Sequence, residues 1–131
     1  MNDATHEARI LAQAFVVAVF LLLAAAFGSC AVVNYHEEKK KYPDQTGAGF
    51  FKQLKESGSL AEDPACPVSG GSYRGPAKDV NAMGDADVIF CDEPTNHKDG
   101  SINVLRRNGS MATLKPNDPE YKKALETTTG K

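Results

Sequence analysis

The stretch "SINVLRRNGSMATLK", residues 101–115, decides the fold. Its two halves, "SINVLRR" and "SMATLK", have the composition of short strands, and they flank Asn108-Gly109. Asn-Gly between two such segments is the strongest short-range signal for a β-hairpin. A type I′ turn needs positive φ at both central residues, which Asn and Gly tolerate. The stretch therefore predicts an antiparallel hairpin closed by a type I′ turn.

Two short helices and one further strand are predicted around this hairpin. Apolar residues at helical spacing, followed by a glycine, predict a helix over residues 49–57. Residues 87–92, "DVIFCD", are typical of a short buried strand. Asp118 as a cap and Pro119 at the first helical position predict a second helix. Its buried face should consist of Tyr121, Ala124 and Leu125. The expected fold is an α+β head with an antiparallel sheet.

An apolar segment precedes the head. Residues 10–33, "ILAQAFVVAVFLLLAAAFGSCAVV", carry no charge, and only Gln13 and Ser29 are clearly polar. A helix of this length rises about 36 Å, against a hydrocarbon core of roughly 30 Å. We therefore expect a single-pass transmembrane helix that contacts the lipid bilayer. The expected layout is an N-terminal flank (1–9), this helix (10–33), a juxtamembrane stalk (34–46) and the head (47–131).

The same segment allows a second interpretation. "FGSC" places small residues immediately before Cys30, as in the cleavage box of a lipoprotein signal. Phe27 stands where such a box usually has Leu, and the apolar run continues to Val33. Lipidation of Cys30 is therefore the alternative to an uncleaved anchor.

Cysteines and lysines give opposite indications of the compartment. Three lysines follow the apolar segment (Lys39, Lys40 and Lys41), whereas a single arginine, Arg9, precedes it. By the positive-inside rule, this distribution would keep the head in the cytoplasm. The head has two cysteines, Cys66 and Cys91, and residues 61–87 are so rich in Pro and Gly that they need a covalent staple. A Cys66–Cys91 disulfide would close a loop of about 25 residues and stabilise the head by roughly 3–4 kcal/mol. We therefore expect the head to be extracytoplasmic, in the periplasm or beyond it.

Candidate chemistry is limited to the segment 85–99. Its carboxylates could supply oxygen ligands to Ca²⁺, and the candidate ligands are Asp85, Asp87, Asp92 and Asp99. A zinc site is less favoured, because the two head cysteines are far apart in sequence. His97 has no nucleophile motif beside it and is expected to bond the backbone at the mouth of the hairpin. The net charge of −2 and the lack of a basic stripe exclude nucleic acid as a partner. No enzymatic activity is predicted.

Three segments carry a family resemblance: "CPVSGGSYRGPA", "FCDEPTNHKDG" and "INVLRRNG". They resemble the pilin-like proteins abundant in planctomycetes, whose C-terminal signature is His, nine residues and Asp-Gly. Here the signature residues would be His97, Asn108 and Gly109, with a spacer of ten residues. These proteins are similar to type II secretion pseudopilins, in which an N-terminal membrane helix carries a small α+β head.

The resemblance covers about residues 46–127, and no prepilin peptidase site precedes the apolar segment. It implies a structural or secretion-associated role in the cell envelope, with other pilin-like or secretion-system subunits as partners. The alternative is an envelope lipoprotein or a small module that binds a ligand or Ca²⁺.

Overall fold

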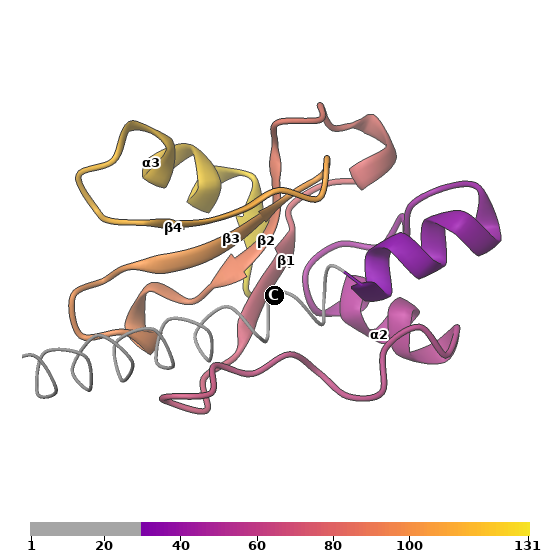
Figure 1. The fold of residues 1–131 in the computed structure, drawn as a ribbon, viewed down its shortest axis with the longest axis horizontal. Helices are drawn as coiled ribbons and strands as arrows, with labels where there is room; N and C mark the ends of the chain where they lie inside the picture. The colour runs from indigo at the N-terminus through magenta and orange to yellow at the C-terminus, as the bar shows by residue number, and fades with distance from the viewer. Residues whose placement is uncertain (1–29) are drawn as a thin grey trace, which may run out of the picture.

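The computed structural model describes residues 30–131. Residues 30–39 are helical. The elements that follow are α2 (Ala48–Glu56), β1 (Tyr73–Pro76), a 3₁₀ turn (Val80–Ala82), β2 (Val88–Asp92), a second 3₁₀ turn (Pro94–Asn96), β3 (Ile102–Arg106), β4 (Met111–Leu114), α3 (Pro119–Glu126) and β5 (Thr128–Thr129) (Figure 1).

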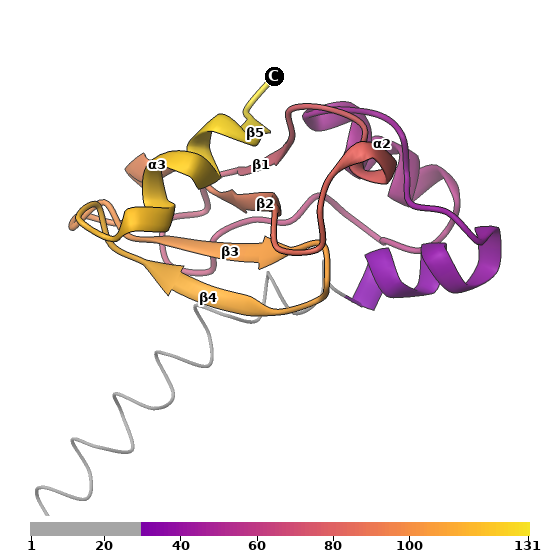
Figure 2. The ribbon, with the colours of Figure 1, turned by 90° about the horizontal axis from the view of Figure 1, so that it is seen from above.

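The five strands form one antiparallel sheet in the order β4-β3-β2-β1-β5, which Figure 2 shows from one edge to the other. Strand β2 is central, and all five of its residues are buried. Tyr73 of β1 pairs directly with Asp92 of β2, and Arg74 pairs with Cys91. The predicted α+β class with an antiparallel sheet is therefore confirmed.

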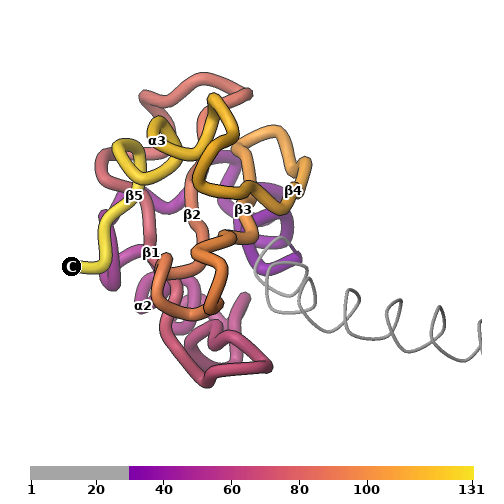
Figure 3. The backbone as a smooth tube through the Cα atoms, turned by 90° about the vertical axis from the view of Figure 1, so that its left-hand side faces the viewer, coloured from indigo at the N-terminus to yellow at the C-terminus, as the bar shows by residue number. Residues whose placement is uncertain are grey.

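Each face of the sheet has its own apolar core, and Figure 3 shows α3 on one side and α2 on the other. The core on the α2 face consists of Ala31, Val32, Tyr35, Phe50, Phe51, Leu54, Tyr73, Val80, Met83, Ile89, Phe90 and Leu105. The core on the α3 face consists of Val88, Cys91, Ile102, Val104, Leu114 and Ala124. Side chains of a strand alternate between faces, so neighbours along β2 enter different cores.

A bulge in β2 interrupts this alternation. The register with β3 shifts between Val88 and Phe90, and Ile89 and Phe90 consequently belong to the same core. An extra residue in one strand moves each following side chain of that strand to the opposite face of the sheet. Cys91 therefore faces α3, and Asp92 faces the α2 side.

The β3–β4 hairpin is confirmed, but the predicted type I′ turn is wrong. Gly109 has a φ of 90°, whereas Asn108 is not among the described residues with positive φ. The Gly109 amide donates to the Arg106 carbonyl, and the Arg106 amide donates to the Ser110 carbonyl. This is a three-residue loop with a glycine bulge. The Asn108 side chain accepts from the Ser110 amide at 2.9 Å, so its side chain is used for the turn while its backbone stays at negative φ.

Both predicted helices are present: α2 lies within a residue of its expected bounds, and α3 begins at Pro119 as expected. Phe50, Phe51 and Leu54 are the buried residues of α2. In α3, Ala124 is buried, and Tyr121 and Leu125 pack against the same core. Asp118 precedes the helix but makes no side-chain cap, because its carboxylate accepts from the Lys115 amide instead.

Strands β1 and β5 lie where no strand was predicted. The Gly47 amide donates to the Pro76 carbonyl, and a methyl group on Gly75 would overlap the Gly47 backbone. Glycine at position 75 is therefore what lets the loop before α2 approach β1.

Some residues of the predicted anchor and of the predicted stalk are buried in the core of the head. Ala31 and Val32, the end of the predicted bilayer segment, are 2% and 4% exposed in the core of the head. Tyr35 and Pro43, from the predicted stalk, are also buried there. The rest of the predicted anchor, residues 10–29, lies outside the described residues. Within residues 30–131, no helix has the length and apolar character needed to cross a membrane.

Candidate functional site

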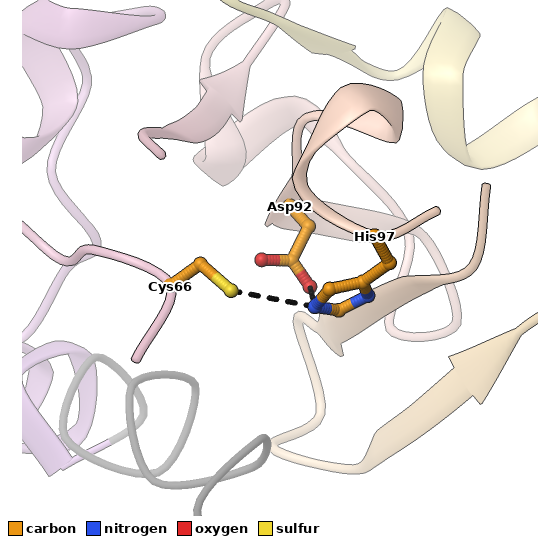
Figure 4. A group of neighbouring side chains, drawn as sticks. All are labelled: Cys66, Asp92 and His97. Carbon is orange, nitrogen blue, oxygen red and sulfur yellow. Dashed lines mark hydrogen bonds and ion pairs between the residues drawn. The ribbon is translucent and has the colours of Figure 1, made fainter. Parts of the chain in front are cut away.

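Three polar side chains meet on the α2 face of the sheet: Cys66, Asp92 and His97 (Figure 4). The Cys66 sulfur lies 3.3 Å from His97 Nε2, and Asp92 Oδ2 lies 4.0 Å from the same nitrogen. One atom from each residue falls within 4.8 Å of the other two. The group is interior: Cys66 is 2% exposed, Asp92 is fully buried, and the His97 side chain is 10% exposed.

A tight loop positions Cys66. The Cys66 amide donates to the Gly71 carbonyl, and the Gly70 amide donates back to the Cys66 carbonyl. Gly70 has a φ of 74°, which glycine adopts without strain and which closes the loop. The loop ends at the bridge between Ala65 and Ser72, directly before β1. This Pro- and Gly-rich segment is thus ordered by backbone hydrogen bonds that hold Cys66 in one place.

Asp92 is held by donors from two other segments. The Asn103 amide donates to Asp92 Oδ2 at 2.9 Å, and the Asn96 side chain donates to Oδ1 at 3.2 Å. Asp92 is the last residue of β2, Asn103 lies in β3, and Asn96 lies in the 3₁₀ turn between the two strands. Three elements therefore fix the position of the carboxylate. A buried carboxylate needs such partners, because burial without them is costly.

The turn between β2 and β3 orients His97. His97 Nδ1 lies 3.0 Å from the Ser101 carbonyl, so this nitrogen carries the proton and donates. The lone pair of Nε2 then points toward Cys66 and Asp92. The predicted backbone hydrogen bond of His97 is therefore present. The contacts of His97 Nε2 with Cys66 and Asp92 are not predicted from the sequence.

The surroundings change the acidity of both Cys66 and His97. Burial opposes ionisation of the Cys66 thiol, but hydrogen bonds from Ser69, from the Val68 amide and from His97 outweigh it and lower the pKa of Cys66. Burial also opposes protonation of His97, but the hydrogen bond with Cys66 and the charge of Asp92 outweigh it and raise the pKa of His97. Both shifts favour a thiolate beside an imidazolium. Such a pair can act as a nucleophile, or its deprotonated form can ligate a metal.

Tyr73 completes the polar side of this site. Its side chain is on the same face as Asp92, because the two residues pair directly across β1 and β2. Tyr73 is 6% exposed, and among the described residues its hydroxyl has no hydrogen-bond partner. Burial, and next the charge of Asp92, raise the pKa of Tyr73. A buried hydroxyl without a partner is rare enough to require an explanation.

The expected Cys66–Cys91 disulfide is not formed. Both residues are free thiols. Cys91 lies in the α3-face core, 3.5 Å from the Thr128 hydroxyl, whereas Cys66 lies on the other face beside His97. The sheet separates them, so no rotamer change could join them. The disulfide therefore no longer supports an extracytoplasmic head.

The candidate Ca²⁺ ligands are not brought together. Asp85 is 3.6 Å from Arg107, and Asp87 is 3.6 Å from Lys123. Asp99 accepts from the Ser101 amide at 2.9 Å, as an aspartate in a turn does. Only Asp92 reaches the cluster with Cys66 and His97. The acidity of residues 85–99 thus serves separate local contacts.

The signature residues lie at the two ends of β3. His97 precedes the strand and reaches the buried cluster, while Asn108 and Gly109 form the turn that follows it. Cys30, the candidate lipidation site, is exposed at the beginning of the described helix. These residues therefore do not form one site.

Comparison of the chain with family models, with curated proteins and with solved structures finds no match.

Proposed function

We propose that the protein is a membrane-anchored, non-enzymatic, pseudopilin-like subunit with a structural or secretion-associated role in the cell envelope. The observation that carries the proposal is the position of residues 30–39. This helix continues the sequence of the apolar segment, and Ala31, Val32 and Tyr35 on it are part of the head's core. A head built around the end of its own anchor helix suits a subunit that must hold a fixed orientation at the membrane.

The opposite side of this helix supports an assembly role. Val33 is 46% exposed, whereas Val32 and Tyr35 on the same helix are buried in the core. An apolar side chain exposed next to a membrane segment is a position where a second helix could pack. Other pilin-like or secretion-system subunits are the partners that the resemblance suggests.

The interior location of the reactive side chains supports a non-enzymatic role. Catalysis by a thiol and a histidine requires that substrate reach the sulfur. Cys66 and Asp92 are covered by the loop 66–71 and by the sheet, and His97 is nearly covered. An extracytoplasmic location belongs to this proposal and is supported by the resemblance.

Membrane attachment is tested by fractionating cells that express the full-length chain. We expect the protein to remain in the membrane after alkaline carbonate extraction, and its mass to include residues 1–29. A mass that begins at a diacylated Cys30 would instead identify the lipoprotein. Protease added outside intact spheroplasts should degrade the head, and protection of the head would place it in the cytoplasm.

Assembly is tested with a photo-crosslinking residue at position 33, and at position 52 as a matched control. Lys52 lies on α2 and is solvent-exposed, so it reports on random encounters. We expect position 33 to crosslink to a second copy or to another anchored subunit, and position 52 to give no product. If neither position crosslinks, the protein is an isolated anchored head and the assembly role is rejected.

A further inference from the structure

We propose that Cys66, Asp92 and His97 bind one Zn²⁺ ion. The three residues come from the loop before β1, the end of β2 and the turn before β3. Their ligand atoms already lie within 4.8 Å of one another. Zinc bonds of about 2.0–2.3 Å place neighbouring ligand atoms roughly 3–4 Å apart. The observed separations of 3.3 Å and 4.0 Å about His97 Nε2 fit this range.

The donor set favours zinc over the ions suggested by acidity alone. Thiolate, imidazole and carboxylate are the three ligand types found in zinc sites, whereas Ca²⁺ takes six to eight oxygens. One thiolate and one carboxylate also balance the charge of a divalent ion. Because the site is buried, this neutrality removes the cost of an uncompensated charge.

Each ligand is oriented by a group behind it, as ligands in metal sites are. The Nδ1 proton of His97 is held by the Ser101 carbonyl, which leaves Nε2 free to bind metal. The Asp92 carboxylate is fixed by the Asn103 amide and the Asn96 side chain. These contacts set the tautomer of the histidine and the plane of the carboxylate.

Tyr73 is the independent observation that points to a ligand here. Its buried hydroxyl lacks a partner among the described residues, and its side chain lies beside Asp92. Three protein ligands leave one position of a tetrahedral zinc ion open. A water at that position, or the Tyr73 phenol oxygen itself, would complete the tetrahedral coordination of the ion. Either arrangement would give the Tyr73 hydroxyl an interaction partner.

The role of this ion would be structural. Residues 61–87 are rich in Pro and Gly, and no disulfide holds them to the sheet. A zinc ion would tie the Cys66 loop to β2 and to the turn before β3. It would thus supply the staple that the composition of this segment requires, and the burial of the site suits a closed structural ion.

The test uses the full-length chain, purified in detergent and stripped with a chelator. Titration with Zn²⁺ should give one tightly bound equivalent. Replacement by Co²⁺ should produce a thiolate-to-cobalt charge-transfer band together with the visible absorption of tetrahedral cobalt. Absence of a saturable equivalent, or a cobalt spectrum without the thiolate band, would overturn the proposal. These measurements need no variant, so a variant that fails to fold does not affect them.

Variants then assign the ligands. Cys66→Ser and His97→Gln should each weaken Zn²⁺ binding by more than about a hundredfold, beyond the 10- to 100-fold cost of losing an orienting group. His97→Cys keeps a ligand and should intensify the thiolate band. Tyr73→Phe should weaken binding by about tenfold. Unchanged binding in Cys66→Ser would show that the metal sits elsewhere.

Cys30→Ser and His36→Gln serve as matched controls. Both remove a metal-binding side chain that lies outside the cluster, and Cys30 is exposed. They should retain the full equivalent of Zn²⁺ and the cobalt spectrum. Loss of binding in either control would identify an adventitious site near the anchor and would contradict the assignment.

Discussion

Cys66 and Cys91 are both buried, yet the two faces of the sheet give their thiols opposite acidity. Burial raises the pKa of Cys91 to about 11, and the hydrogen bond with Thr128 offsets only part of this effect. The Cys66 pKa is lowered, because hydrogen bonds from Ser69, Val68 and His97 outweigh its burial. Depth in the protein therefore does not decide the state of a thiol. Hydrogen-bond donors aimed at the sulfur decide it.

The same contrast extends to the neighbouring residues. The α3 face around Cys91 is an apolar core. The α2 face holds Asp92, His97 and the Tyr73 hydroxyl, which has no hydrogen-bond partner within residues 30–131, among its aromatic residues. An apolar core tolerates loss of one small group, but a polar network fails when one member is removed. The two faces are best compared in protein stripped of metal.

The largest expected difference is between Asp92→Ala and Cys91→Ala. Removing the Asp92 carboxylate takes away the acceptor that the Asn103 amide and one N–H of the Asn96 side chain share, and the negative charge beside His97. This should lower the free energy of unfolding by about 3–5 kcal/mol. Cys91→Ala removes one sulfur from a packed core and should cost about 1 kcal/mol. Urea unfolding of the full chain in detergent, followed by circular dichroism, measures both. Equal losses would mean that the polar cluster is not a network.

A smaller difference is expected at alkaline pH. The folded pKa of Cys91 is raised from 9.0 to about 11, so its contribution to stability is complete below pH 9 and declines as pH rises toward 11. By pH 10 the loss should be about 1 kcal/mol. Cys91→Ala should remove this part of the decline in unfolding free energy between pH 8 and pH 10.

Cys66→Ala should change the alkaline decline in the opposite direction. The folded pKa of Cys66 is lowered, so its contribution is present above the unfolded pKa and is lost as pH falls. Removing Cys66 should therefore make the alkaline decline steeper than in the wild type. If both alanine variants shifted the curve in the same direction, the assignment of opposite thiol states would be wrong.

The smallest expected effect is that of Ser69→Ala. The Ser69 side chain is the largest of the groups that lower the pKa of Cys66. Because Ser69 is exposed, its loss should change the free energy of unfolding by no more than about 0.5 kcal/mol. It should nevertheless raise the pKa of Cys66, read from the pH dependence of the cysteine Cβ chemical shifts by NMR. The titration of Cys91 should not move, and a shift at Cys91 would point to a general loosening of the fold.

Local sequence signals are sufficient to predict the elements whose hydrogen bonds join residues close in sequence. The hairpin from Ile102 to Leu114, helix α2 and helix α3 each contain their own spacing, cap or turn residues. The turn type was predicted wrongly because Asn-Gly fits both the two-residue loop and the three-residue loop with a bulge. Strand β5, two threonines beside β1, has no local signal, since its pairing is created by the path of α3.

The site could not be predicted, because it depends on one irregularity in β2. Strict alternation from Val88 would have put Cys91 on the α2 face, the face of Cys66. The bulge between Val88 and Phe90 reverses this and places Asp92 there instead. The residue that reaches the Cys66 site is therefore Asp92, one position after Cys91, the partner expected from the sequence. No composition or spacing rule registers a single inserted residue of this kind.

The burial of Ala31, Val32 and Tyr35 has a mechanical consequence. A helix joined to the sheet by a loose polar linker would swing freely, and tension on it would stretch only the linker. Here the helix that begins the described residues packs in one core with Phe50, Phe51 and Phe90. A pull on residue 30 would thus be applied directly to the aromatic core beneath β2, and this helix can leave the rest of the fold only by opening that core.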